Sequence, residues 1–267
     1  IKSFSNNIYM DYKDKYLKYK IKYMNLKSKH IHNQVGGKEK LFPNQIDFVP
    51  EIDPIEIEFN EELFKKSFPE DKKVNFKKLK MSNIGKYSVS DPKSAQYISD
   101  VIKSYFPKNN NLIITDATAN MGGNTINFAK NFSKVNSVEI IKLHCKFLEN
   151  NIKQYKLSKN VNIKCNDYFD VMLDLKQDII FIDPPWGGTD YKKIPYLDLS
   201  LNNVDIGDIV NKLKEKAKMI VLKVPKNFNL TKIVRSSNFK RIDIHKVCYD
   251  SNGVCILRYF YVIFLNF

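Results

Sequence analysis

The sequence lacks any apolar run of the ~20 residues that a helix needs to span a bilayer, and its Lys- and Tyr-rich N-terminal residues contain no signal-peptide core. Cysteine is scarce, and the four residues are Cys145, Cys165, Cys248 and Cys255. None forms a CxxC pair, and no histidine stands at metal-ligand spacing to them. We therefore expect cysteines that serve as small apolar side chains, a reducing intracellular compartment, no membrane partner and no bound metal.

Negative charge is also in short supply. The chain has 44 Lys and Arg against 29 Asp and Glu, which leaves a net charge of +15. Such a surplus favours a polyanionic partner, because each neutralised phosphate releases counterions. The alternative is a lysine-rich, AT-biased genome, which also raises Asn, Ile and Tyr. The length of 267 residues suits one large domain with a short accessory piece, and we expect a monomer.

Residues 1–45 differ in composition from the rest and are predicted to form a basic arm and linker. Aromatic and apolar residues recur there at helical spacing among lysines, namely Tyr12, Tyr16, Tyr19, Tyr23 and Leu26. This spacing predicts an amphipathic helix ending near Lys29. The arm either contacts RNA or a partner, or packs its tyrosines on the body of the protein. Residues 46–90 are predicted to form an N-terminal extension with a short helix at 61–68.

From residue 91 onward strands and helices alternate, so residues 91–267 are predicted to form one α/β domain. Asp91 is suited to cap a helix that begins with Pro92 and ends near Phe106. The predicted strands are 112–116, 135–141, 161–165, 178–183, 219–224, 241–247 and 254–264, and the other helices are 124–132, 142–155, 206–217 and 231–237. The alternation predicts a mostly parallel, doubly wound sheet that ends in an antiparallel hairpin. This arrangement resembles the class I methyltransferase (Rossmann-like) fold with its seven-stranded sheet.

A segment with paired glycines, Asp116 to Asn124, follows the first strand of this domain. Ligands of open α/β sheets bind at the carboxyl ends of the strands, near the switch in strand order. Gly122 and Gly123 let the backbone approach a ligand closely, and Asn120 tolerates left-handed conformations. The segment therefore predicts a cofactor loop, whose candidate contacts are Asp116, Ala117, Gly122, Gly123 and Asn124.

Acidic residues follow the next two predicted strands. Glu139 stands about 20 residues after the glycines, where a carboxylate can bind both ribose hydroxyls. Asp167 can accept a hydrogen bond from an adenine amino group, with Tyr168 or Phe169 against the ring. Alternatively, each acid caps a helix or lies in a surface turn. Because no helix N-terminus is clearly suited to a pyrophosphate, the pattern favours S-adenosyl-L-methionine over NAD as the cofactor.

The apolar strand 178–183 runs directly into Asp183-Pro184-Pro185-Trp186-Gly187-Gly188. Proline fixes φ and lacks an N–H group, which leaves the carbonyl near Pro184 free to accept. Asp183 and that carbonyl can then both accept from one exocyclic amine, and two acceptors favour a pyramidal nitrogen with its lone pair aimed at a methyl carbon. The sequence therefore predicts amine methylation with Asp183, Pro184 and Trp186 as catalytic residues. The alternative is a strand end capped by a rigid turn.

Trp186 is the only tryptophan of the chain. A tryptophan face attracts a cationic ring more strongly than the other aromatic side chains do. A purine methylated at N7 is such a ring, which indicates a substrate like the mRNA cap.

These motifs resemble those of the trimethylguanosine synthase family, the RNA cap guanine-N2 methyltransferases, over about residues 87–267. The residues that match are the Gly-Gly-Asn-Thr-Ile-x-Phe-Ala run at 122–129, Glu139 ahead of Asn150, Asn151 and Tyr155, and the Pro-Pro-Trp-Gly-Gly-x-x-Tyr run at 184–191. The family converts 7-methylguanosine caps to 2,7-dimethyl or 2,2,7-trimethyl caps without a metal. The resemblance thus implies capped RNA as partner, with Trp186, Gly187 and Tyr191 as substrate contacts.

Two further segments carry the same resemblance. Tyr87-Ser88-Val89-Ser90 is similar to a segment that lies over the cofactor, which implies cofactor contacts for Ser88 and Ser90 and puts residues 46–90 over the active site. Pro225-Lys226-Asn227 is similar to a Pro-Arg-Asn segment whose basic residue contacts the cap phosphates, which implies substrate contacts for Lys226 and Asn227.

The sequence departs from the family pattern in its first motif, where Asn120 replaces a glycine, and at two positions that bear on the substrate. Lys226 replaces an arginine, which weakens bidentate phosphate binding, and Asp183 replaces a serine. Asp183 keeps open an adenine-N6 methyltransferase acting on RNA or DNA, and a non-catalytic RNA-binding domain is a third alternative. The N-terminal run also resembles leaders of proteins from large DNA viruses, for which the expected location is nucleus, cytoplasm or viral factory.

Overall fold

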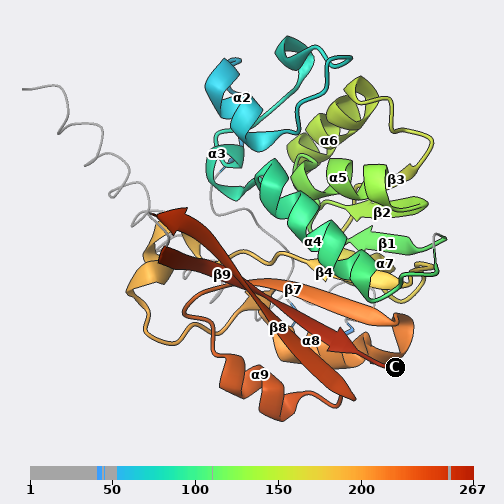
Figure 1. Cartoon of the computed structure of the whole chain (residues 1–267), viewed down its shortest axis with the longest axis vertical. Helices are drawn as coiled ribbons and strands as arrows, with labels where there is room; N and C mark the ends of the chain where they lie inside the picture. Colours follow the sequence, from blue (N-terminus) through green and yellow to red (C-terminus); the bar gives the residue numbers. More distant parts are fainter. Residues whose placement is uncertain (1–40, 44, 46–52, 110, 252–253) are drawn as a thin grey trace, which may run out of the picture. The chain divides into compact units, whose positions relative to one another are not determined.

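The computed structural model describes residues 41–43, 45, 53–109, 111–251 and 254–267, which are drawn in colour in Figure 1. The chain divides into two units, Ile1–Asp53 and Pro54–Phe267, and the second contains every element discussed below. The helix predicted between Tyr12 and Leu26 lies outside the described residues. Within the described part, no helix is both long and apolar enough to cross a membrane.

A seven-stranded sheet of order β3-β2-β1-β4-β7-β9-β8 forms the centre of the second unit. Its strands are β1 (Ile113–Asp116), β2 (Lys134–Val138), β3 (Val161–Lys164), β4 (Ile179–Ile182), β7 (Met219–Pro225), β8 (Arg241–Ser251) and β9 (Val254–Leu265). The first five in this order are parallel, whereas β9 pairs antiparallel with both β7 and β8. The predicted class I methyltransferase fold, with its antiparallel hairpin, is confirmed.

Helices connect the strands and cover both faces of the sheet. They are α2 (Glu61–Ser67), α3 (Gly85–Ser88), α4 (Pro92–Ser104), α5 (Gly123–Asn131), α6 (Lys142–Gln154), α7 (Tyr168–Val171), α8 (Ile206–Lys212) and α9 (Leu230–Ser236). In Figure 1, α4 and α5 lie side by side above the central strands, with α8 and α9 below them. All four residues of β4 are fully buried, because helices cover this strand on both faces of the sheet. Its sequence is accordingly an unbroken apolar run.

Helix α4 begins as the sequence predicts. The Asp91 side chain accepts from the Ser94 N–H, and Pro92 occupies the first turn, where a missing N–H costs nothing. Its buried residues Ile98 and Ile102 pack in one core cluster with Phe128 of α5 and Phe181 of β4. This packing orients α4 so that the residues just before it, Tyr87 to Ser90, reach the carboxyl edge of the sheet.

The N-terminal extension shares the core of the methyltransferase fold. Phe64 and Phe68, on and just after α2, are buried in a second cluster with Met121 and Leu148. Asn151 of α6 ties the extension down further, since its amide donates to the Lys80 carbonyl and accepts from the Lys80 N–H. Residues 54–90 are therefore part of one compact unit with the sheet.

Several short elements escaped the sequence prediction. They are the two-residue strands β5 (Ser200–Leu201) and β6 (Val204–Asp205), the helices α3 and α7, and 3-10 turns at Phe76–Lys78, Gly188–Lys193 and Lys214–Lys216. The helix predicted to run to 217 ends as α8 at Lys212 and continues only as the last of these turns. Most are too short for a periodic pattern to develop, which is why apolar spacing did not reveal them.

The prediction for the cysteines is wrong. The structure joins Cys145 of α6 to Cys165 after β3, and Cys248 to Cys255 across the β8–β9 hairpin. Their Cα atoms lie 5.7 and 5.3 Å apart, within the usual disulfide range. Because all four sulfurs are paired, the cysteines no longer indicate a reducing compartment. The potential metal-ligand atoms of Cys145, Glu149 and Cys165 all lie within 4.8 Å of one another. The disulfide occupies the two sulfur atoms of this group.

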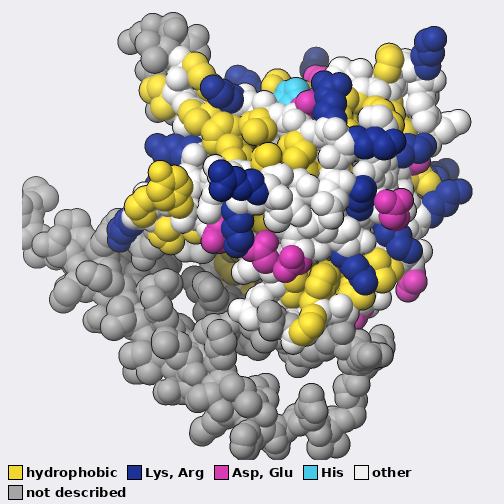
Figure 2. All heavy atoms as spheres, turned by 90° about the horizontal axis from the view of Figure 1, so that it is seen from below, with side chains coloured by type: hydrophobic (Ala, Val, Ile, Leu, Met, Phe, Trp, Pro, Cys, Tyr) yellow, Lys and Arg dark blue, Asp and Glu magenta, His cyan; other side chains and the backbone are white. Residues whose placement is uncertain are grey.

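The surface reflects the basic composition. Figure 2 shows Lys and Arg side chains spread over the displayed face, interspersed with apolar patches and with few acidic side chains. A spread of this kind attracts polyanions over a broad area, and it does not by itself mark a binding track.

Candidate active site

Three acidic side chains meet at the carboxyl edge of the sheet. Asp116 ends β1, Glu139 follows β2 and Asp183 follows β4, and these strands are neighbours. Asp116 is fully buried and accepts from the Thr125 hydroxyl at 2.7 Å. Burial raises its pKa to about 7, and the charges of Asp183 and Glu139 add to the effect. Asp116 and Glu139 belong to the predicted set of acids at successive strand ends, and Asp183 joins them here in place of Asp167.

The glycine loop adopts the conformation its residues allow. Gly122 has φ +101° and Asn120 has φ +52°, so both lie in the left-handed region. A Cβ on Gly123 would stand 2.9 Å from the Ser90 carbonyl oxygen and 2.7 Å from the Val89 side chain. Glycine is therefore required at 123 because the loop passes directly under the extension.

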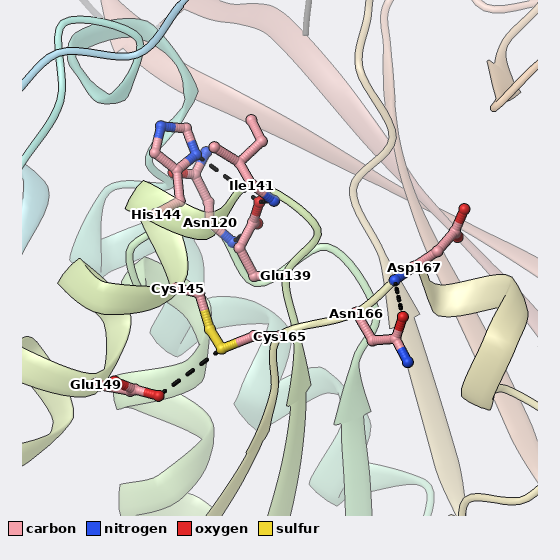
Figure 3. Close-up of a disulfide and its surroundings, with 9 residues drawn as sticks. All are labelled: Asn120, Glu139, Ile141, His144, Cys145, Glu149, Cys165, Asn166 and Asp167. Atoms are coloured by element: carbon pink, nitrogen blue, oxygen red, sulfur yellow. Dashed lines mark hydrogen bonds and ion pairs between the residues drawn. A yellow bond between two sulfur atoms is a disulfide. The ribbon is translucent and has the colours of Figure 1, made fainter. Parts of the chain in front are cut away.

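Glu139 is buried, and its side chain lies beside Asn120 of this loop (Figure 3). One carboxylate oxygen accepts from the Asn120 N–H at 2.7 Å, and the other accepts from the Ile141 N–H at 2.8 Å. Burial raises the pKa of Glu139 to about 7, against the opposing effect of these hydrogen bonds. Since a carboxylate has about four lone-pair sites, these two bonds orient Glu139 and leave it able to accept ribose hydroxyls.

A buried histidine backs Glu139. His144 Nδ1 stands 3.9 Å from the Glu139 carboxylate, and its Nε2 lies 2.9 Å from the hydroxyl of Ser82 in the extension. Burial lowers the pKa of His144 to about 4, so the ring is neutral at pH 7. Sequence reasoning missed both residues.

The extension contacts the cofactor loop through the two serines that the family resemblance selected. Ser88 Oγ accepts from the Asn120 amide at 2.8 Å, and Ser90 Oγ accepts from the Asn124 amide at 3.1 Å. The amide oxygen of Asn124 is buried and has no hydrogen-bond partner among the described residues. An orphaned acceptor beside a glycine loop and buried acids fits a polar cofactor such as S-adenosyl-L-methionine. Ala117, also buried, anchors the start of the loop by donating its N–H to the Phe181 carbonyl.

The two residues chosen after β3 have structural roles in this arrangement. Asp167 caps α7 by accepting from the Phe169 N–H, and it also accepts from the Asn202 amide at 2.6 Å. The helix-cap alternative is therefore realised for this acid. Tyr168 is buried, with 3% of its surface exposed, which leaves its ring little area for an adenine. A cofactor role for either residue stays a prediction.

The backbone of Asp183, at the start of the Asp-Pro-Pro-Trp motif, is held in place by hydrogen bonds. Thr118 Oγ1 accepts from the Asp183 N–H at 3.0 Å and donates to the Asp183 carbonyl at 3.1 Å. Pro184, next in the chain, is buried. The loop after β1 thus positions the end of β4, and Asp183 projects from a fixed backbone.

Lys223 of β7 pairs with the Asp183 side chain. Its Nζ donates to Asp183 Oδ2 at 2.7 Å and to Ser90 Oγ at 2.8 Å, so Ser90 touches both halves of the site. Burial raises the pKa of Asp183, and the Lys223 charge opposes that rise. Lys223 was not among the residues predicted from the sequence. It is the one charged residue in the apolar strand 219–225, and a charge in a buried strand usually has a partner, so this position could have been identified.

Trp186 lies half-buried in an aromatic group. The Tyr191 ring contacts it edge-on at 5.3 Å, and Tyr259 of β9 lies behind it at 6.3 Å. The indole N–H is buried without a hydrogen-bond partner in the described residues. A Cβ on Gly187 or Gly188 would meet no described atom within 4 Å, so space opens beside the ring. The group can hold a flat ring with an acceptor directed at the indole N–H.

The last segment chosen from the sequence supports this loop. The Asn227 amide donates to the carbonyls of Tyr191 and Ile194, at 2.8 and 2.6 Å, and so fixes the chain that carries the Tyr191 ring. Lys226 is exposed beside it. Asn227 therefore fixes the backbone between Tyr191 and Ile194, and substrate contacts of Asn227 and Lys226 stay predictions.

Known proteins match the part of the chain that contains the sheet. The profile of the RNA cap guanine-N2 methyltransferase family matches residues 110–263. An uncharacterised protein of Acanthamoeba polyphaga mimivirus is 38% identical over 154 residues, which cover 55% of this chain and 60% of that protein. The trimethylguanosine synthase of Saccharomyces cerevisiae is 25% identical over 159 residues, covering 57% of this chain and 50% of the enzyme. The chain thus spans little more than half the length of these curated relatives.

Among solved structures, the chain is similar to a SAM-dependent O-methyltransferase of Thermotoga maritima. The match has a TM-score of 0.47 at 16% identity and covers 67% of this chain and 66% of that one.

Proposed function

Because the chain belongs to the RNA cap guanine-N2 methyltransferase family, we propose that it methylates N2 of the 7-methylguanosine cap of RNA, giving 2,7-dimethyl- or 2,2,7-trimethylguanosine. The observation that carries the proposal is a continuous hydrogen-bonded chain from Asn124 through Ser90 and Lys223 to Asp183. It joins the cofactor loop to the residue that faces the amine, so both reactants would be held by one rigid network.

The cofactor would be held by the glycine loop and its neighbours. Glu139 accepts the ribose hydroxyls, and the orphaned Asn124 oxygen and Asp116 offer acceptors to the polar end of the molecule. Ser88 and Ser90 close the loop from above. S-Adenosyl-L-methionine supplies a methyl group made electrophilic by its sulfonium.

Asp183 and the Pro184 carbonyl would accept from the amine of the guanine. An aromatic amine is a poor nucleophile because its lone pair is delocalised into the ring. Two acceptors on its N–H bonds favour a pyramidal nitrogen, and positioning of this kind lowers the barrier by several kcal/mol, on the order of 10²–10³ in rate. The new N–C bond would form as the S–CH3 bond of the cofactor breaks, with S-adenosylhomocysteine as the leaving group, and one N–H proton would leave to Asp183 or to water.

Trp186 would stack on the base. Its face favours the cationic ring of 7-methylguanine over the neutral ring of guanine. The open space at Gly187 and Gly188 leaves room for the ring, and Lys226 would meet the phosphates that follow it.

The test is mass spectrometry of cap analogues after incubation of the full chain with S-adenosyl-L-methionine. We expect a mass increase of one or two methyl groups on 7-methylguanosine triphosphate and little on GTP. Methylation of adenine oligomers with no transfer to cap analogues would instead favour the adenine-N6 alternative, which Asp183 motivates. If calorimetry shows that the chain does not bind S-adenosyl-L-methionine, a non-catalytic RNA-binding domain is favoured instead.

A further inference from the structure

Lys223 is buried where a lysine is expensive to bury. Its side chain is 10% exposed, and that of its partner Asp183 is 15% exposed. The ammonium also lies 5.6 Å from the Trp186 ring centroid and 5.3 Å from that of Tyr259. Replacing such a pair by apolar residues often costs no stability, so stability alone does not account for it. Its position suggests a role in the chemistry of Asp183.

The ammonium of Lys223 acts on the charge of Asp183, whose pKa stays above its ordinary value even with this partner. Burial alone raises the pKa of this carboxyl, and the Lys223 charge together with its hydrogen bond pulls in the other direction. Burial is the largest single effect and lowers the pKa of Lys223, but Asp183, Tyr259 and Asp91 together raise it above its ordinary value, so the ammonium stays charged. Without Lys223, Asp183 would lose its main source of stabilisation and hold its proton to higher pH.

The protonation state of Asp183 changes what it can recognise. An ionised carboxylate only accepts hydrogen bonds, whereas a protonated carboxyl both donates and accepts. Guanine presents two adjacent donors, N1–H and the N2 amine. Adenine presents the N6 amine as donor beside N1, which is an acceptor. A charged carboxylate therefore matches the guanine edge and repels N1 of adenine, and a protonated carboxyl matches the adenine edge.

We propose that Lys223 is a specificity-determining residue that keeps Asp183 ionised, so that the site takes the donor–donor edge of guanine and rejects adenine. The proposal rests on the proposed function, since it concerns the same amine site. It also gives the Asp of an Asp-Pro-Pro-Trp motif a role in guanine recognition. The structural basis is one contact, 2.7 Å between Lys223 Nζ and Asp183 Oδ2, made from a strand next to β4.

The test compares Lys223→Met with Lys223→Arg in the full chain. Each variant is assayed with 7-methylguanosine triphosphate and with an adenine oligomer, across pH. For Lys223→Met we expect the acid limb of kcat/KM on the cap analogue to move to higher pH, because Asp183 then ionises later. At neutral pH the preference for guanine over adenine should fall at least ~10-fold. Lys223→Arg keeps the charge and should restore the limb toward its wild-type position.

Lys218→Met is the matched control. Lys218 stands immediately before the same strand, also pairs with an aspartate, Asp178 at 2.9 Å, and lies at the opposite edge of the sheet. Its loss should leave the pH profile and the guanine preference unchanged. A shift of equal size in Lys218→Met would overturn the assignment, because the effect would then be a general result of losing a lysine.

A double variant covers the case in which Lys223→Met fails to fold. Asp183→Asn with Lys223→Met removes both buried charges together and avoids an unpaired one. The amide offers one donor and one acceptor, so guanine preference should be lost at every pH and the acid limb due to Asp183 should disappear. A wild-type guanine preference in this variant would overturn the proposal.

The outcomes separate this inference from the function it rests on. If the wild-type chain methylates no cap analogue, the proposed function fails and no conclusion about Lys223 is needed. If the wild type methylates the cap analogue and Lys223→Met keeps both its acid limb and its guanine preference, the function stands and the role of Lys223 is refuted.

Discussion

The Thr118 hydroxyl bonds the backbone of Asp183 on both sides, accepting from its N–H and donating to its carbonyl. Thr118→Val keeps the shape and removes both bonds, leaving two backbone groups without partners. We expect a loss of about 1–3 kcal/mol in stability and a fall in kcat of about 10- to 100-fold as Asp183 moves. Urea unfolding and steady-state kinetics measure the two effects. Thr231→Val, on exposed α9, should change neither.

Trp186→Ala should separate substrate binding from cofactor binding. Loss of the stacked ring is expected to weaken binding of 7-methylguanosine triphosphate by about 10- to 100-fold and to leave cofactor affinity nearly unchanged. Glu139→Gln should have the opposite profile, because its carboxylate orients the cofactor loop. Isothermal calorimetry with each ligand reads both affinities. Equal losses of the two ligands in Trp186→Ala would contradict its assigned role.

Asp116→Asn should change how stability depends on pH. The folded pKa of Asp116 is about 7, above its ordinary value of 3.8, so the folded state holds this proton more tightly than the unfolded state. The protonated Asp116 carboxyl therefore stabilises the folded state fully below about pH 4, and this stabilisation is lost as pH rises toward 7. The variant should therefore gain stability relative to wild type over that window, by an order of a few kcal/mol.

Chemical unfolding at pH 4 and pH 7, without added cofactor, measures this difference. Asp208→Asn, an exposed acid on α8, is the control and should give the same difference from wild type at both values. A constant difference for Asp116→Asn as well would show that the carboxyl ionises normally in the folded protein.

The two disulfides should differ in how much they contribute to the free energy of unfolding. Cys145 and Cys165 are 20 residues apart and Cys248 and Cys255 are 7 apart. In the chain-entropy model, replacing the first pair by serine costs about 3 kcal/mol and the second about 2 kcal/mol. Denaturant unfolding with and without a reductant measures both values. If the free energy of unfolding of the wild-type protein is the same with and without reductant, the pairs are not bonded in solution.

Much of the fold followed from local patterns. The apolar run ahead of Asp183 and Pro184 predicted a buried strand, and β4 is that strand. The alternation of strands and helices predicted the parallel sheet, and the consecutive strands β8 and β9 predicted the hairpin. These signals succeed because each depends on residues close together in sequence.

The missed residues depend on strand pairing. Lys223 meets Asp183 because β4 and β7 pair in parallel with Ile182 opposite Leu222, which brings the following residues together. Nothing in the sequence states which strand neighbours β4, so a lysine 40 residues away carried no visible link to the motif. The Cys145–Cys165 disulfide was missed for the same reason, since Cys145 reaches Cys165 only once α6 packs beside β3. Cys248 and Cys255 lie on the two strands of the predicted hairpin, so that pairing was open to prediction from the sequence.

The position of β9 has a consequence for how the protein is made. This strand is synthesised after the other six of the sheet, yet it lies between β7 and β8 and supplies Tyr259 behind Trp186 and Lys223. A nascent chain that has not released β9 from the ribosome therefore presents the bare edge of β7, with its apolar side chains, to other chains. Assembly of the aromatic group around Trp186 and protection of the β7 edge from aggregation should thus occur in one step, when β9 joins the sheet.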